Sequence, residues 1–275
     1  MDWELFWASL WPIVRGGLIG TIPLSIASFA IGLVIALLVA LARISGIRLL
    51  SVVAQFYVSV IRGTPLLVQL FVIFYWLPSL GLLIDPWPSA VIAFSLNVGG
   101  YAAEVIRAAI LSVPKGQWEA GHTIGMSRTT TLRKIILPQA ARVSVPPLSN
   151  TFISLVKDTS LASLILVTEL FREAEKIAAF SQEFVMIYMQ AALVYWVFSL
   201  VLSTAQSRIE KRLDRYVAHC ITVGFADARI HSGGAPAARG ARTRQVIRRQ
   251  RGAALHRLHP SRGQGARGDR PVWIG

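Results

Sequence analysis

The residues best placed to do chemistry form one polar segment between two long apolar runs. It contains Glu119-Ala120-Gly121, then Gly125, and then Ile135, Leu137 and Pro138. Its other polar side chains include Lys115, Gln117, His122, Arg128, Arg133 and Lys134. Such charges are too costly to place in hydrocarbon, so the segment lies in water or against another protein. Glu119 is either a solvated acid or a charge on a docking surface, and Gly125 fits a turn because glycine reaches positive φ freely.

A second set of polar residues lies inside apolar runs, at Asn97, at Glu104 and in Lys157-Asp158-Thr159-Ser160. Polar groups in such runs face a bundle interior or a wet cavity. Glu104 and Arg107 are three residues apart, so they share a helix face and can pair. The set is either structural or lines a solute path, with Glu104 near an amino or cationic group. Lys157 and Asp158 are adjacent and therefore reach different partners.

Gln69 is a further polar residue in an apolar run, and we expect it to hydrogen-bond between helices. Nothing in the sequence indicates catalysis. No Gly-rich phosphate loop opens a helix, and no Cys or His cluster has metal-ligand spacing. His122 stands alone, and Cys220 is the only cysteine. We therefore expect no enzyme, no metal site and no cofactor.

Composition indicates which elements must position these residues. The 275 residues are 54% hydrophobic and 15% charged, against about 25% charged in soluble domains. The mean hydropathy is +0.55. A membrane helix needs roughly 20 apolar residues. We predict an all-α membrane protein with about five spans, the fourth entered through Pro146-Pro147. The spans are 17–42, 64–83, 90–113, 142–168 and 184–203, and residues 49–61 form an interfacial segment.

The basic residues of the short loops predict the orientation, because Lys and Arg are in excess on the cytoplasmic side. One set of loops carries Arg43, Arg48, Lys115, Arg128, Arg133, Lys134, Arg208, Lys211, Arg212 and Arg215. The opposite set, at Asp85 and in the loop 169–183, has acids in excess. The N-terminus is therefore predicted outside, and residues 114–138 in the cytoplasm.

These residues together resemble a known family over residues 14–217. The matching runs are Arg62-Gly63-Thr64-Pro65, Ser95-Leu96-Asn97, Tyr101-Ala102-Ala103-Glu104, Ser112-Val113-Pro114-Lys115-Gly116-Gln117-Trp118-Glu119-Ala120 and Lys157-Asp158-Thr159-Ser160-Leu161. They are similar to the membrane (permease) subunits of polar amino-acid ABC importers, the binding-protein-dependent transport inner-membrane components. Gly121 departs from the pattern, since the family usually has Ala there. Gly is a poorer helix former than Ala by roughly 1 kcal/mol.

The resemblance implies a function and partners. Residues 114–138 would be the cytoplasmic coupling loop, with Glu119, Ala120, Gly121, Gly125, Ile135, Leu137 and Pro138 forming the contact to a separate ABC ATPase. The chain would form the solute path in a bacterial inner membrane, among lipid. It would pair with a second copy or a sibling permease, and an extracytoplasmic solute-binding protein would deliver the amino acid. A secondary transporter or channel, independent of ATP, is the alternative.

The composition changes after Val217, and this defines two predicted domains, 1–217 and 218–275. The second contains eleven Arg, no Lys and two Asp, and supplies +9 of the net charge of +14. A basic arm that binds nucleic acid or lipid is one interpretation. We favour another, because permissible codons for 269–275, shifted by one base, encode Ile-Gly-Pro-Ser-Gly-Ser, which resembles the opening of an ABC ATPase. We therefore expect 218–275 to be a low-order, out-of-frame tail without a nucleic-acid partner.

Overall fold

The computed structural model describes residues 3–231, with side chains as far as Lys211. Its contacts divide the chain into two units, Met1–Tyr216 and Val217–Gly275. The described residues contain helices and no strand, which confirms the predicted all-α class. The helices are α1 Trp3–Gly16, η1 Gly17–Thr21, α2 Ile22–Ile44, α3 Arg48–Gly63, α4 Leu66–Phe71, η2 Val72–Trp76, α5 Leu77–Ser79, α6 Pro86–Ser112, α7 Lys115–Thr123, α8 Arg128–Thr131, η3 Leu132–Ile136, α9 Leu137–Asp158, η4 Thr159–Ile165, α10 Leu170–Ser181 and α11 Phe184–His231.

Five spans emerge if bent helix pairs are counted as single crossings. Within the described residues, three stretches are long and apolar enough to cross a membrane alone, namely Trp3–Ile44, Pro86–Ser112 and Phe184–Lys211. Two pairs pass the same test together. Arg48–Gly63 and Leu66–Ser79 are bent by 108°, and Arg128–Ile165 and Leu170–Ser181 by 49°. The segment predicted as interfacial is thus α3, the first arm of the sharper bend.

Several predicted boundaries were wrong. The first span is part of a continuous helix that starts at Trp3, because a π-helical turn at η1 joins α1 to α2 without a break. Pro146 and Pro147 lie inside α9 rather than at its start. The fourth span ends as a 3₁₀ helix, η4, which stops at Leu166 in the left-handed conformation. Helix α11 continues to His231. The predicted domain boundary after Val217 stays a prediction, and the division of contacts after Tyr216 lies one residue from it. The rest of the predicted tail, 232–275, lies outside the described residues.

Helix α10 was not predicted, since residues 169–183 were expected to form a loop. Glu169 caps its N-terminus, with the carboxylate accepting a hydrogen bond from the backbone N–H of Arg172 at 2.7 Å. Leu170, Ala174 and Ala178 form its buried face at four-residue spacing. A search for long apolar runs does not detect such a short amphipathic helix, because the helix is recognised by the spacing of its apolar residues and not by its mean hydropathy.

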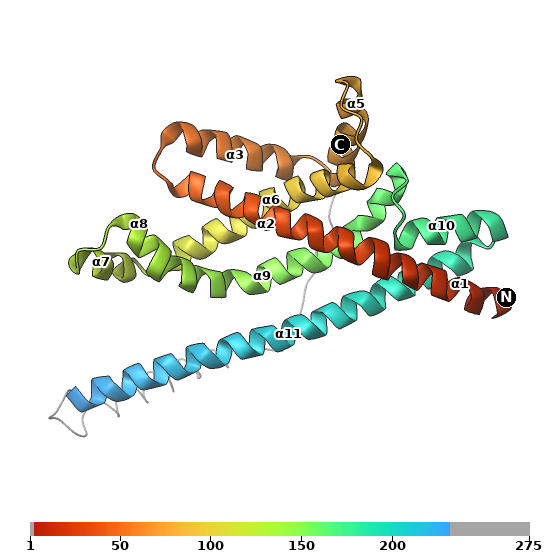
Figure 1. Ribbon diagram of the computed structural model, residues 1–275. Helices are drawn as coiled ribbons and strands as arrows, with labels where there is room; N and C mark the ends of the chain where they lie inside the picture. Colours follow the sequence, from red (N-terminus) through yellow and green to blue (C-terminus); the bar gives the residue numbers. More distant parts are fainter. Residues whose placement is uncertain (1–2, 232–275) are drawn as a thin grey trace, which may run out of the picture. The chain divides into compact units, whose positions relative to one another are not determined.

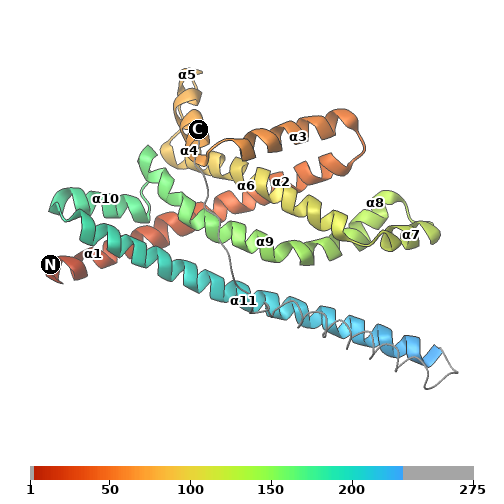
Figure 2. The same ribbon diagram turned by 180° about the vertical axis from the view of Figure 1, so that it is seen from behind.

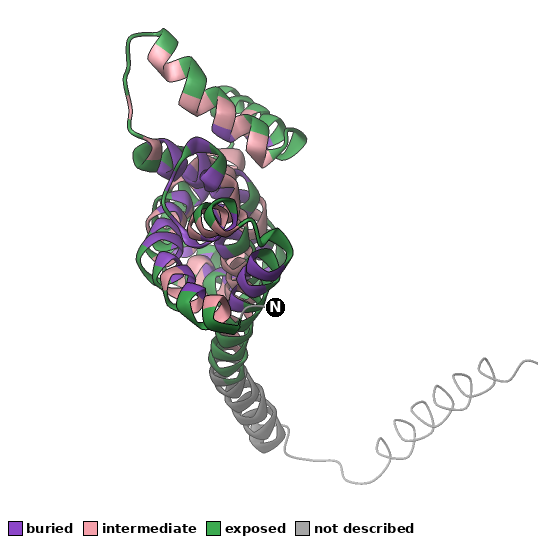
Figure 3. Cartoon of the chain, turned by 90° about the vertical axis from the view of Figure 1, so that its right-hand side faces the viewer, coloured by how far each residue is buried: buried purple, intermediate pink, exposed green. Residues whose placement is uncertain are grey.

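The centre of the first unit is the packing of α2 against α6. Gly32, Ala36 and Ala40 of α2 are buried at four-residue spacing. A Cβ built on Gly32 would lie 2.6 Å from Val98 Cγ1 of α6, so only glycine permits this approach. Small residues let helix backbones come close, which is how helices associate where lipid removes the hydrophobic drive. Buried residues gather inside the bundle and exposed ones cover its outside (Figure 3).

The two sets of predicted loops lie at opposite ends of this bundle. The turn from α2 to α3 lies at the same end as α7 and α8, and the N-terminus and α10 lie at the other (Figures 1 and 2). A separate core of α1, α10 and α11 residues forms at the second end, around Ile13, Leu170 and Ile187.

Candidate functional site

The loop 114–138 folds into two short helices and a π-helical turn. Gly125 adopts φ +78° between α7 and α8, which confirms the predicted turn. The backbone N–H of Met126 donates to the Gly121 carbonyl at 3.0 Å and closes the end of α7. Ser127 caps α8, because its Oγ accepts from the Thr130 N–H at 3.3 Å. Capping of this kind satisfies backbone donors that a helix start leaves unpaired.

Gly121 lies at the contact between these two helices. It is buried, and a Cβ built on it would lie 2.6 Å from both Cγ2 and Oγ1 of Thr131. Thr131 is itself held, because its hydroxyl donates to the Ser127 carbonyl at 3.1 Å. The missing methyl group at position 121 therefore has a local steric reason: α7 and α8 touch there.

The outer face of the loop presents an acid and an apolar side chain. Glu119 and Ala120 are exposed on α7. Ile124, at the end of the helix, is 73% exposed although it lies among polar residues. The sequence analysis did not single out Ile124. It could have been found as an apolar residue within a charged segment. An exposed apolar side chain beside a charge is suited to contact with another protein.

The inner face of the loop is anchored to the bundle. Ile136 is fully buried, in one cluster with Ala109, Ile110 and Ala140 of α6 and α9. Trp118, Leu132, Ile135 and Leu137 pack partly buried against the same cluster, and Pro138 is exposed at the start of α9. Ile135 and Leu137 thus contact the bundle with part of their surface, and their contact to an ATPase stays a prediction.

A cavity of about 450 Å³ is lined by residues of α4, α6, α9 and η4, and it brings together two of the predicted path residues. Asn97 of α6 and Asp158 of α9 both line it. Asn97 Nδ2 donates to Gln69 Oε1 at 3.0 Å, and Gln69 Nε2 donates to the Ile61 carbonyl at 2.7 Å. The prediction that Gln69 hydrogen-bonds between helices is therefore confirmed. The Arg62 guanidinium lies 5.6 Å above the ring of Tyr101, another lining residue.

The other predicted path residues lie elsewhere. Glu104 accepts hydrogen bonds from Arg107, with Nε to Oε1 at 3.1 Å, and also from Arg43 of α2. The predicted pairing with Arg107 is therefore confirmed, and Glu104 does not line the 450 Å³ cavity. Lys157 and Ser160 line a different cavity, of about 560 Å³, against α10 and α11. Thr159 is fully buried, and its hydroxyl donates to the Val156 carbonyl at 2.8 Å.

Sequence reasoning also missed polar residues of the 450 Å³ cavity, in particular Asn150, Ser154 and Tyr101. A signal was present. Asn150, Ser154 and Asp158 are spaced by four, which places them on one face of α9. Tyr101 follows Asn97 by four on α6, for the same reason.

The fold is that of the membrane subunits of amino-acid ABC importers. Residues 32–215 match the family model described as the binding-protein-dependent transport system inner membrane component. The chain belongs to this family.

Two curated relatives and one solved structure agree with that assignment. The L-cystine transport system permease protein TcyB of Bacillus subtilis (strain 168) is 62% identical over 79% of this chain and 94% of that protein. The glutamine transport system permease protein GlnP of Escherichia coli (strain K12) is 41% identical over 77% of this chain and 97% of its own length. An amino acid ABC transporter crystallised with histidines matches with a TM-score of 0.73 and 34% identity, over 77% of this chain and 99% of that one.

Proposed function

We propose that the chain is the transmembrane subunit of an ATP-driven importer of polar amino acids, and that cystine is the first solute to test. The observation that carries the choice of solute is the 62% identity to TcyB over 94% of that protein, against 41% to GlnP. Our proposal includes two ATPase subunits on the cytoplasmic side, a second permease subunit and an extracytoplasmic solute-binding protein. The N-terminus lies outside in this arrangement.

The loop 114–138 supports the proposed coupling. Glu119 and Ile124 are exposed on its outer face, where they would contact the ATPase. Ile136 is buried on its inner face against α6 and α9. Closure of two ATPase subunits would move both loops, and the buried anchor would carry that movement into the two helices that hold the solute cavity. An interface transmits movement in this way because packed cores shift between discrete arrangements.

The 450 Å³ cavity supports the proposed solute path. An amino acid carries an ammonium and a carboxylate group on one carbon. The Asp158 carboxylate in the lining suits the ammonium group. Arg62 is not a lining residue, but it stacks on the lining residue Tyr101, which makes it the cation we propose for the carboxylate. Asn97 and Asn150 offer amide groups that can bind either end. We therefore propose Asn97 and Asp158 as path residues, and assign Glu104, Lys157, Thr159 and Ser160 no solute contact.

Reconstitution tests the function. The chain, purified with its ATPase, is placed in liposomes with the solute-binding protein, and uptake of labelled cystine is measured with ATP, without ATP, and under an imposed ion gradient. We expect uptake only with hydrolysable ATP, and weaker competition by glutamine than by unlabelled cystine. Uptake driven by the ion gradient without ATP would instead establish a secondary transporter.

A substitution at Glu119 tests the proposed coupling role of the loop. Glu119→Lys reverses a charge on the docking face and should abolish ATP-dependent uptake while membrane insertion stays normal. Gln117→Lys, also exposed on α7, introduces a cation without removing the acid and serves as the comparison. Unchanged uptake by Glu119→Lys would remove Glu119 from the proposed contact.

A further inference from the structure

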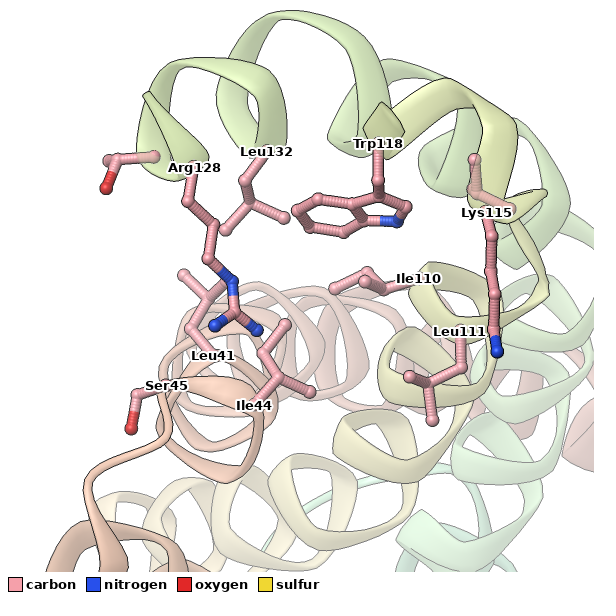
Figure 4. Close-up of a pocket in the computed structure, with 11 residues that line it drawn as sticks. Leu41, Ile44, Ser45, Ile110, Leu111, Lys115, Trp118, Arg128 and Leu132 are labelled. Carbon is pink, nitrogen blue, oxygen red and sulfur yellow. The ribbon is translucent and has the colours of Figure 1, made fainter. Parts of the chain in front are cut away.

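A cavity of about 710 Å³ lies beneath the loop 114–138, on the side that faces the bundle. Its walls come from the ends of α2 and α6, and its roof from α7, α8 and η3. Figure 4 shows the Trp118 ring above Ile110, with Leu132 beside it. Apart from two cations and two hydroxyls the lining is apolar: Leu41, Ile44, Ile110, Leu111, Val113, Trp118 and Leu132. Ligand sites combine such apolar walls with a few polar groups.

The two cations stand on opposite sides of this cavity. The Arg128 guanidinium points from α8 toward Leu41, Ile44 and Ser45, and Lys115 extends from α7 beside Leu111 (Figure 4). Among the residues whose side chains are described, neither cation lies within 4.0 Å of a carboxylate, in contrast to Arg43 and Arg107, which both bind Glu104. The cavity therefore presents positive charge without an internal counterion.

The position of the cavity points to the lipid headgroup region. It lies where α2 and α6 end, and the residues around this end are basic and predicted cytoplasmic. Leu111 is 62% exposed in the cavity wall, and Ile47, just after α2, is 60% exposed. Large apolar residues exposed at the end of a span face acyl chains. The exposed apolar side chains at this side of the cavity suit contact with acyl chains, and the two cations at the ends of the spans suit contact with phosphate groups.

We propose that this cavity binds an anionic glycerophospholipid of the cytoplasmic leaflet. Lys115 and Arg128 hold its phosphate, and one acyl chain lies over Ile44, Ile110 and Trp118. Basic pockets between helices on the cytoplasmic side suit acidic headgroups. The bound lipid would support α7 from beneath and link the coupling loop to the composition of the membrane. This inference is independent of which solute the permease carries.

Photolabelling tests the proposal. The whole transporter, purified through a tag on this chain, is placed in nanodiscs with a small fraction of phosphatidylglycerol that carries a diazirine in its acyl chain, and labelled peptides are mapped by mass spectrometry. We expect labels near Ile44, Ile110 and Trp118. Lys115→Gln with Arg128→Gln should weaken binding about 25-fold, at roughly five-fold for each basic residue. The control is Arg208→Gln with Lys211→Gln, which also removes two positive charges, from exposed positions on α11. It should leave labelling unchanged.

A second variant distinguishes loss of the lipid site from misfolding of the first variant. Leu111→Trp fills the cavity without changing charge, at a side chain already 62% exposed, and should also displace the label. Equal labelling by a phosphatidylcholine probe would show that the anionic headgroup is not recognised. Labelling that survives both cavity variants, or a cross-link from this cavity to the ATPase in place of lipid, would overturn the proposal.

Discussion

Gly121 shows how a single residue limits the geometry of the loop 114–138. Its Cα faces Thr131 so closely that an added methyl group would lie 2.6 Å from two side-chain atoms. The contact sets the distance between α7, which presents Glu119, and α8, which begins the return to the bundle. The lower helix propensity of glycine at this position is thus offset by a closer approach of the two helices.

We expect Gly121→Ala to destabilise the loop, because forced overpacking costs typically 1 to 3 kcal/mol, partly offset by about 1 kcal/mol of helix propensity. The measurement is uptake-coupled ATP hydrolysis by the reconstituted transporter. Thr131→Ala removes both clashing atoms, so the double variant should recover most of the coupling. If Gly121→Ala alone behaved as wild type, the contact would not restrict the loop.

Asp158 and Lys157 are adjacent residues that face different cavities, and this makes them a matched pair. We expect Asp158→Asn to abolish most amino-acid uptake, because it removes the carboxylate proposed to bind the solute ammonium group. Lys157→Gln should retain uptake. ATP hydrolysis without solute should persist in both variants, and the comparison of initial uptake rates decides the assignment. The opposite ranking would place the path on the α10 side.

At the scale of elements, one buried acid adds polar contacts to the apolar packing of α10 against its neighbours. Glu169 is fully buried, and its Oε2 accepts from Tyr195 OH at 2.9 Å and from Thr21 Oγ1 at 3.2 Å. Its other oxygen caps α10 through the Arg172 N–H. One side chain therefore connects η1, α10 and α11. Buried polar groups of this kind are costly to leave unsatisfied.

We expect Tyr195→Phe to lower the free energy of unfolding by about 1 to 3 kcal/mol, since it withdraws a donor from a buried carboxylate. Thermal unfolding in detergent measures the effect. Glu173→Gln is the comparison on the same helix, because the half-buried Glu173 carboxylate pairs at 2.9 Å with Lys176, whose side chain is 48% exposed. Such exposed pairs contribute about 1 kcal/mol or less. Equal losses of unfolding free energy for the two substitutions would show that the contacts of Glu169 do not stabilise the packing of α10.

Helices α6 and α9 connect the two candidate sites. α6 carries Asn97 at the cavity and Ile110 at the loop anchor, thirteen residues and roughly 20 Å apart at 1.5 Å per residue. α9 carries Asp158 and Ala140 in the same two places. Coupling between loop and cavity thus requires only that these two helices move as stiff bodies.

At the scale of the whole molecule, the family match ends at residue 215. The described contacts of α11 with α9 include Gln206 Nε2, which donates to Asn150 Oδ1 at 3.0 Å. We therefore expect deletion of 218–275 to leave membrane insertion and uptake intact. Deletion from Ala205 onward should reduce both, because it removes this contact and the last turns of α11 within the family match. Loss of transport on the shorter deletion would make the tail functional.

The sequence by itself determined the class of protein and the position of its loop. Long apolar runs require helices in a membrane, since backbone groups there must be satisfied within the helix. The charged segment around Glu119 had to lie outside the hydrocarbon of the membrane, and Gly125 was expected in a turn. The pairing of Glu104 with Arg107 and the bonding of Gln69 between helices also followed from local spacing and the cost of burying polar groups.

The tertiary structure alone decided which residues meet. Asn97 and Asp158 are sixty-one positions apart, and only the packing of α6 with α9 brings them to one cavity, while Lys157 turns to another. Helix α10, the hydrogen bonds of Glu169 to two other helices and the cavity beneath Trp118 were not predicted from the sequence for the same reason. Periodicity assigns a residue to a face of its own helix, but the identity of the facing helix depends on side-chain packing between segments far apart in the chain.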